Sequence, residues 1–317
     1  MEYLNPKIKF YKERTLGEKL SVVFDFLRET WKPFLKFSFY LILPICLFQS
    51  FVLNSSMSKI YSMGYNMGAG DEGIDFYPVI LSYFLYFLFV LLGTSVLNAM
   101  VYSLISEYDQ RETRLMNITL QDFKSSLMKK IVKLLRAYLL FVGALVLGGL
   151  LAFLLLSIFS SPVFRVLFVL LLIVIVIGML FIMVPLNLFM PIYLFEDISF
   201  WEALKKTFKY GFSHWGGTFI IVFIFGLLAN IISSVTMMPW YVMMMVGQVL
   251  SITEQGTGIN ASIWYQFISY LLGILQSYGM YASYMLTSVG IAFQYFHIRE
   301  KKEGITMDTN IQNFDRL

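Results

Sequence analysis

The sequence contains few charged and few reactive side chains. Only 14% of its 317 residues are charged, and it has 1 cysteine and 2 histidines. A single cysteine permits no internal disulfide, and two histidines cannot supply the usual zinc or iron ligand sets. Cys46 lies in an apolar run, where a thiolate is disfavoured, so it is interpreted as a packing residue.

Catalytic motifs are also absent. The chain has no phosphate-binding Gly-x-x-x-x-Gly-Lys motif, no His-Glu-x-x-His and no Gly-x-Ser-x-Gly elbow. We therefore expect no enzymatic activity, no cofactor and no metal. The net charge of +4 is distributed over membrane-facing segments, and nothing in it indicates nucleic-acid binding.

Apolar residues make up 58% of the chain, which is typical of a membrane protein. Since about 20 apolar residues cross a bilayer, uncharged runs of that length or more predict membrane spans. The runs are 37–58, 76–106, 137–164, 166–195, 215–253 and 255–296. We expect an all-α polytopic helical membrane protein with six transmembrane helices, forming one integral membrane domain over residues 1–317.

Prolines divide two of these runs. Pro185 and Pro191 are expected to kink the fourth span before the surface helix that follows it. Pro239 is expected to end the fifth span, so that Tyr241–Ile252 forms a separate interfacial or re-entrant helix. The first span is expected from about Pro33 to Leu53, with an outer loop at Asn54–Asp75.

The central parts of the six runs contain no ionisable residue. Because proton-coupled transporters usually need one, this absence disfavours proton-coupled transport. Asn98, Asn187 and Asn230 are the main polar candidates at depth. They could form interhelical hydrogen bonds, or they could line a path for a neutral or amphiphilic ligand.

Basic residues predict the orientation. Of the 24 lysines and arginines, only Lys59 and Arg165 fall on one side of the predicted spans. The positive-inside rule places both termini in the cytoplasm, with residues 298–317 as a flexible tail.

Three Ser/Thr-x-x-Asp/Glu boxes mark helix starts, at Thr15, Thr119 and Ser199. Each begins an amphipathic helix that feeds a span, and we expect all three helices to lie on the cytoplasmic surface. In the first, Lys19 belongs to the polar face. The pattern predicts a threefold internal repeat, with units of about 15–105, 119–195 and 199–297.

The lysines of the second and third surface helices are candidate contacts for anionic headgroups, and setting the topology is their alternative role. They are Lys124, Lys129, Lys130, Lys133, Lys205, Lys206 and Lys209. Arg136 lies on the same outward face as the first four, and His214 and His297 are both expected at this interface.

Small residues spaced by four positions predict close helix contacts. One stripe is Ala144, Gly148 and Ala152, and others begin at Gly273 and Gly279.

Three features follow one another in this part of the chain: Pro191-x-x-x-x-Glu196, then Ser199-x-x-Glu202-Ala-Leu-Lys-Lys, then Trp215 before a span. Together they resemble a bacterial group of integral membrane proteins. Relatives of that group form the membrane part of some glycerophosphodiester phosphodiesterases. The resemblance covers about 191–225 and implies a six-span protein of the bacterial inner membrane, without the catalytic residues of the phosphodiesterase domain.

These patterns favour a non-enzymatic scaffold, assembly or membrane-homeostasis protein that contacts anionic lipids and a protein partner of unknown identity. The alternative is a transporter or carrier of a lipid-like or uncharged substrate.

Overall fold

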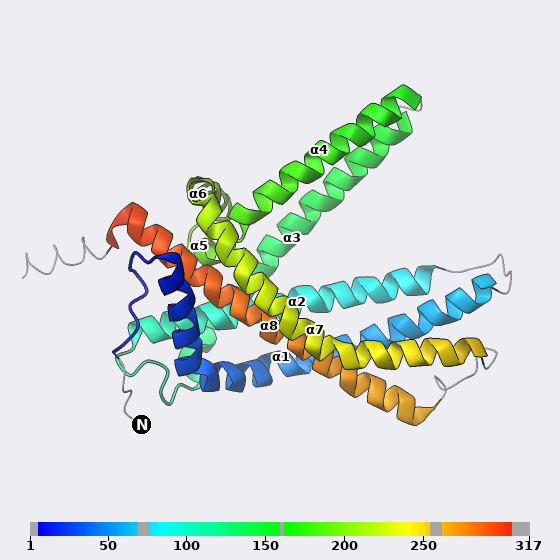
Figure 1. The fold of residues 1–317 in the computed structure, drawn as a ribbon, viewed down its shortest axis with the longest axis horizontal. Helices are drawn as coiled ribbons and strands as arrows, with labels where there is room; N and C mark the ends of the chain where they lie inside the picture. The colour runs from blue at the N-terminus through cyan, green and yellow to red at the C-terminus, as the bar shows by residue number, and fades with distance from the viewer. Residues whose placement is uncertain (1–5, 69–75, 159–161, 254–261, 306–317) are drawn as a thin grey trace, which may run out of the picture. The chain divides into compact units, whose positions relative to one another are not determined.

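The computed structural model describes residues 6–68, 76–158, 162–253 and 262–305 (Figure 1). Its elements are all helices: α1 (Leu16–Gly68), α2 (Tyr77–Gln110), α3 (Leu120–Ile158), α4 (Pro162–Leu186), α5 (Phe189–Phe195), α6 (Phe200–Ser213), α7 (Trp215–Thr253) and α8 (Ile263–Glu303).

Helices in the described ranges are long and apolar enough to cross a membrane in 5 places. These segments are Leu16–Met57, Tyr77–Gln110, Leu120–Leu155, Val166–Phe195 and Trp215–Val249. Their length and composition confirm the prediction of a helical, multi-pass membrane protein.

The chain divides into two compact units built from discontinuous segments. Unit 1 comprises residues 1–30, 102–224 and 289–317, and unit 2 comprises 31–101 and 225–288. Helices α1, α2, α7 and α8 each contribute to both units, whereas α3 to α6 belong to unit 1 alone.

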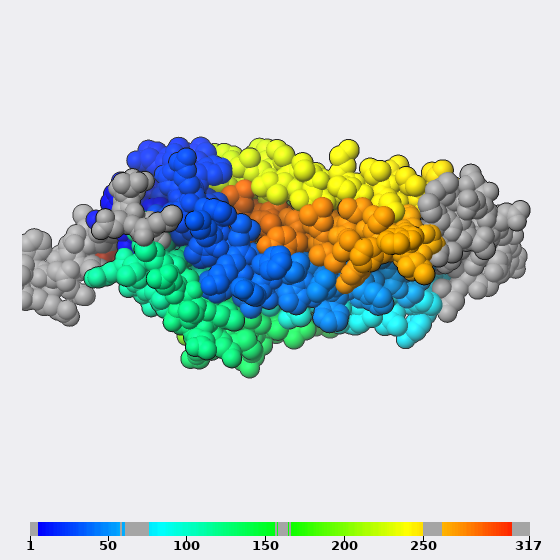
Figure 2. Space-filling model, turned by 90° about the horizontal axis from the view of Figure 1, so that it is seen from below, coloured from blue at the N-terminus to red at the C-terminus, as the bar shows by residue number. Residues whose placement is uncertain are grey.

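Unit 2 is a bundle in which small residues allow close packing. In Figure 2 the part of α8 that belongs to unit 2 lies between α1 and α7 on the face shown. A Cβ atom added to Gly279 would overlap the Thr236 side chain of α7, and one added to Gly273 would overlap Ser50 of α1. The contacts expected at these two glycines are therefore confirmed.

Polar side chains link the helices of unit 2. Tyr281 donates a hydrogen bond to Gln49 at 2.7 Å, and Ser288 donates to Asn98 Oδ1 at 2.9 Å. Such bonds contribute only about 0.6 kcal/mol each on average in membrane proteins, so they fix the pairing of helices more than they add stability.

Unit 1 has an aromatic core. Phe10 packs against Phe26 and Tyr108 at ring-centroid distances of 5.7 and 5.5 Å, and against Phe293 at 5.3 Å. All four side chains are almost completely buried. Because Phe10 precedes the first helix, the N-terminal segment is held to the unit by its own aromatic anchor.

The predicted helix starts are confirmed. At Ser199 the capping box is complete, since the Ser199 hydroxyl accepts from the Glu202 N–H at 3.4 Å and Glu202 accepts from the Ser199 N–H at 3.1 Å. The Thr15 and Thr119 N–H groups each donate at 2.7 Å to the carboxylate three residues later.

The kink expected at Pro185 is present as a break between two helices, whereas Pro191 lies within α5. Helix α4 ends at Leu186, one residue after Pro185, and α5 resumes at Phe189. Gly211 of α6 lies so close to Pro185 that a Cβ atom would overlap the proline. The break therefore also provides the surface on which α6 packs.

Two predicted boundaries are wrong. Helix α1 continues through Pro33, Pro44 and Asn54 to Gly68, so the first surface helix and span are one element and Asn54–Gly68 is helical. The rest of the predicted outer loop, 69–75, lies outside the described residues. Helix α7 continues past Pro239 to Thr253. A proline removes one backbone donor, but neighbouring helices let membrane helices tolerate that loss.

Two further expectations need correction. A Cβ atom at Gly148 would meet nothing within 4 Å, so the close helix contact expected at Gly148 is absent among the described residues. Residues 298–303, expected in the flexible tail, instead form the end of α8, which runs to Glu303.

We predict that Gly279→Ala destabilises the protein by about 1–3 kcal/mol, because the added methyl group overlaps Thr236 in a packed bundle. Thermal unfolding in detergent measures the effect. Gly178→Ala is the matched control, since its added methyl group meets no atom within 4 Å. Equal unfolding temperatures for the two variants would contradict the prediction.

Candidate functional site

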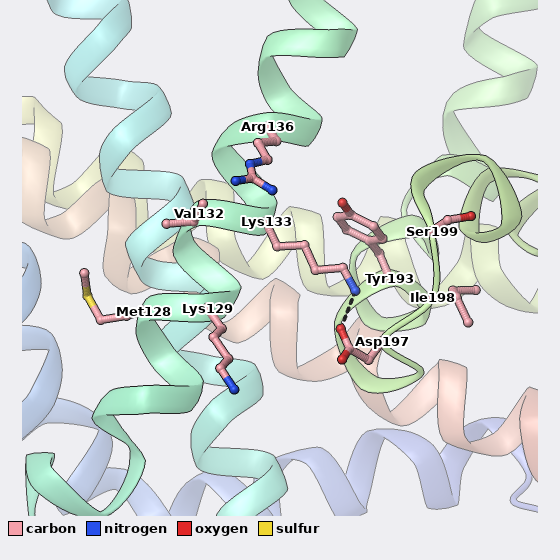
Figure 3. Close-up of a pocket in the computed structure, with 9 residues that line it drawn as sticks. All are labelled: Met128, Lys129, Val132, Lys133, Arg136, Tyr193, Asp197, Ile198 and Ser199. Atoms are coloured by element: carbon pink, nitrogen blue, oxygen red, sulfur yellow. Dashed lines mark hydrogen bonds and ion pairs between the residues drawn. The ribbon is translucent and has the colours of Figure 1, made fainter.

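A pocket of about 710 Å³ opens in unit 1 between α3 and the segment that joins α5 to α6 (Figure 3). Helix α3 contributes Met128, Lys129, Val132, Lys133 and Arg136. Tyr193 of α5 and residues Asp197, Ile198 and Ser199 form the opposite wall. We call this the α3 pocket.

Helix geometry places the cations of the α3 pocket together. Lys129, Lys133 and Arg136 are spaced by four and three residues, which brings them to one face of α3. The facing segment is shaped by Asp197, whose positive φ of 50° turns the chain between the end of α5 and the Ser199 cap. A left-handed conformation is uncommon outside glycine but is tolerated by aspartate.

One ion pair spans the α3 pocket. Figure 3 shows Lys133 extending toward Asp197, and its ammonium donates to Asp197 Oδ1 at 2.7 Å. The same ammonium lies 4.3 Å from the centre of the Tyr193 ring. The Lys133 hydrogen bond and charge lower the pKa of Asp197, which stays ionised at neutral pH. Because Asp197 is 90% exposed, an ion pair of this kind contributes at most about 1 kcal/mol.

The α3 pocket retains excess positive charge. It contains three basic side chains and one carboxylate. No ion pair within the described residues involves Lys129 or Arg136, and both are exposed. The arrangement can therefore accept an anion at its rim.

The lysines predicted to contact headgroups lie in several different environments. Lys129 and Lys133 line the α3 pocket, whereas Lys124, Lys205 and Lys209 are exposed outside it. Lys130 turns toward α2 and donates to the Tyr102 carbonyl at 3.2 Å and to Ser106 at 3.3 Å.

Lys206 belongs to a charged network that the sequence did not suggest. Its ammonium lies 2.7 Å from both Glu196 and Glu303, and Arg299 lies 2.7 Å from Glu303. Tyr295 donates to Glu196 at 3.0 Å, and Tyr210 also bonds to Glu303. The network joins α5, α6 and α8 within unit 1, so the Lys206 side chain holds these helices together and does not face a headgroup site.

Electrostatics in this network favour the charged forms. Burial raises the pKa of Glu303, but hydrogen bonds from Arg299, Lys206 and Tyr210 outweigh it and lower the pKa to about 2. Burial likewise lowers the pKa of Lys206, but hydrogen bonds to Glu196 and Glu303 raise it above its ordinary value.

Of the three predicted intramembrane asparagines, Asn98 and Asn230 bond to their own helices, and Asn187, one residue past the end of α4, bonds back to α4. Asn98, Asn187 and Asn230 donate to the carbonyl four residues earlier, at 3.0, 2.8 and 2.9 Å. Among the described residues, only Asn98 of the three also bonds to another helix, through Ser288. None of the three lines the α3 pocket or the pocket of unit 2 described next.

A second pocket, of about 600 Å³, lies within unit 2 between α1, α7 and α8. Phe51, Met244, Ile263 and Phe267 supply apolar surface, and the polar lining residues are Asn54, Ser55, Lys59, Tyr265, Gln266, Ser269 and Tyr270. Its walls suit a molecule with both an apolar and a polar part.

Sequence reasoning missed Tyr193 and Asp197 as members of the α3 pocket. The spacing of the basic residues on α3 predicted one wall, but the opposite wall depends on a turn at Asp197 for which the local sequence carries no glycine or proline signal.

Comparison of the chain with protein-family models, with curated proteins and with solved structures finds no match.

We predict that the Glu303 network makes stability depend on acid pH. The unfolded pKa of glutamate is about 4.3 and the folded value here is about 2, so the stabilisation is present above pH 4.3 and is lost as the pH falls toward 2. In Glu303→Gln, stability should fall less steeply over this window than in the wild type, as measured by denaturant unfolding. Glu13→Gln, at an exposed position outside the network, serves as control. Parallel pH profiles for wild type and Glu303→Gln would contradict the prediction.

Proposed function

We propose that this protein is a non-enzymatic membrane scaffold that holds anionic lipid headgroups in the α3 pocket. The observation that carries the proposal is the excess of basic side chains in a pocket of headgroup size. A phosphate group there would accept from Lys129, Lys133 and Arg136, and each cation near a membrane surface contributes about 1 kcal/mol.

The surface next to the α3 pocket suits the rest of a lipid. Immediately beyond Arg136 on α3, Leu139 and Leu140 are exposed, as are Leu147 and Leu151 farther along. None of the most apolar stretch of α3 is buried within the protein. A lipid whose headgroup occupied the pocket could therefore lay its acyl chains along the same helix.

The second candidate is a carrier of a lipid-like or uncharged substrate. The amphiphilic lining of the unit 2 pocket favours it, because both apolar and hydrogen-bonding side chains converge there. The scaffold is preferred since the α3 pocket combines concentrated charge with an adjoining apolar helix surface.

The membrane arrangement is part of the proposal. We infer six spans, with a sixth at about Ser262–His297 added to the five apolar segments above, and both termini in the cytoplasm of a bacterial cell. The kinship with the membrane part of glycerophosphodiester phosphodiesterases and the threefold repeat belong to the same proposal.

We predict that removing the three cations of the α3 pocket reduces the retention of acidic phospholipids at least tenfold. Three contacts of about 1 kcal/mol each correspond to roughly a hundredfold in affinity, and lipids held elsewhere reduce the measured difference. The variant is Lys129→Gln with Lys133→Gln and Arg136→Gln, and the measurement is quantitative mass spectrometry of lipids that co-purify in mild detergent.

The matched control is Lys124→Gln with Lys205→Gln and Lys209→Gln, which removes the same charge from exposed lysines outside the pocket. Equal lipid loss from both triple variants would show that only general surface charge matters, and the proposed site would then be rejected.

We predict that both chain ends face the same side of the membrane. In a Cys46→Ser background, single cysteines introduced at Glu13 and Lys302 should react with an impermeant thiol reagent only in inside-out vesicles. A cysteine at Arg165 should react only in right-side-out vesicles. Labelling of the two ends from opposite sides would exclude an even number of spans.

A further inference from the structure

Lys19 is buried where α1, α7 and α8 meet within unit 1. Its side chain is only 7% exposed, although it lies in the second turn of an amphipathic helix. Its ammonium donates to Gln294 Oε1 at 2.9 Å, and Gln294 Nε2 donates to Thr218 Oγ1 at 3.2 Å. Gln294 and Thr218 are buried as well.

The Lys19 ammonium has no acidic partner among the described residues. It carries three protons, and the hydrogen bond to Gln294 uses one of them. No carboxylate lies within ion-pair distance of it in the described ranges. A buried charge without a counter-charge is destabilising, so an anion placed beside Lys19 would be stabilising.

The charges around Lys19 are also positive. Burial lowers the pKa of His214, and the charges of Lys302, Lys301 and Lys19 lower it further. The positive charges of Lys19, Lys301 and Arg14 also disfavour the positively charged form of the His297 ring. Glu18 is the nearby acidic residue on α1, and it is used by the Thr15 cap.

Backbone and imidazole donors lie in the same region. Helix α7 begins at Trp215, and its first turn leaves N–H groups without partners inside the helix. Gly216 is open, since an added Cβ atom would meet nothing within 4 Å, and at Gly217 it would meet only Gln294 Nε2 at 3.5 Å. His297 Nδ1 accepts from the Arg14 N–H at 3.0 Å, which leaves Nε2 as the protonated nitrogen of a neutral ring.

We propose that Lys19, Gln294, the two histidines and the first turn of α7 form a binding site for a phosphate group. We call it the Lys19 site. A helix N-terminus and a buried ammonium both favour an oxyanion, and the open glycine backbone at Gly216 permits close approach. The phosphate can belong to a phospholipid or to a free anion. The site is separate from the α3 pocket and does not depend on the function proposed for it.

Thermal unfolding of the full-length protein in detergent, with increasing inorganic phosphate at constant ionic strength, tests the Lys19 site. Wild type should show a saturable rise in unfolding temperature. Lys19→Met should respond at least about tenfold more weakly, whereas Lys19→Arg keeps the charge and should retain part of the response. Lys209→Gln, at an exposed lysine of the same unit, should behave as the wild type.

Native mass spectrometry of the same samples distinguishes the source of the phosphate. A phospholipid that stays bound to wild type and Lys209→Gln but is lost from Lys19→Met would assign the site to a lipid phosphate. A response to inorganic phosphate without retained phospholipid would assign it to a free anion.

The wild type alone can overturn the proposal. If it neither responds to phosphate nor retains phospholipid, the Lys19 site does not exist, whatever the variants do. A response or a bound lipid that is unchanged in Lys19→Met would also reject it. Should Lys19→Met fail to fold, Lys19→Gln replaces it in the same comparison.

Discussion

The constraint on which the structure depends is that every backbone polar group in a bilayer must find its partner within the protein. Helices meet this requirement by themselves, which explains why the described chain is built from long helices. It also explains why prolines act differently here than in water. Helix α7 continues past Pro239, because neighbouring helices and side chains can satisfy the backbone groups that a proline frees in a membrane helix, whereas the chain breaks one residue after Pro185, close to a charged segment. The cost of exposing backbone thus decides where a helix can stop.

Charges follow from the same constraint, since they concentrate outside the most apolar stretches of the long helices. In unit 1 two carboxylates pair with cations from other segments: Glu29 with Arg114 at 2.8 Å, and Glu196 with Lys206 of the next helix at 2.7 Å. Glu29 and Glu196 have side chains only 11% and 8% exposed, so removing either cation would leave a poorly solvated charge. These pairs hold the helix ends in register, and the aromatic core around Phe10 packs beside them.

The sequence predicts the features that depend on local chemistry and misses those that depend on distant segments. The boxes at Thr15, Thr119 and Ser199 place helix starts correctly, because a cap is formed by residues three positions apart. Lys129 and Lys133 share a helix face for the same reason. Periodicity places Lys19 on the polar face of its helix, but Lys19 is covered by Gln294, which lies 275 positions away. Composition places Glu303 in a flexible tail, but α8 extends to it and Lys206 of α6 binds it. No local pattern encodes such partners.

The distribution of acidic residues connects the two proposed sites. Four carboxylates of unit 1 pair with particular cations: Glu196 and Glu303 with Lys206 and Arg299, Glu29 with Arg114, and Asp197 with Lys133. Lys129, Arg136 and Lys19 receive no such partner in the described residues. Exposed cations can be compensated by water and salt, but Lys19 is shielded from both. A membrane presents phosphate groups at the depth where helix ends lie. Anions from outside the chain can therefore pair with the cations that its own carboxylates leave unpaired.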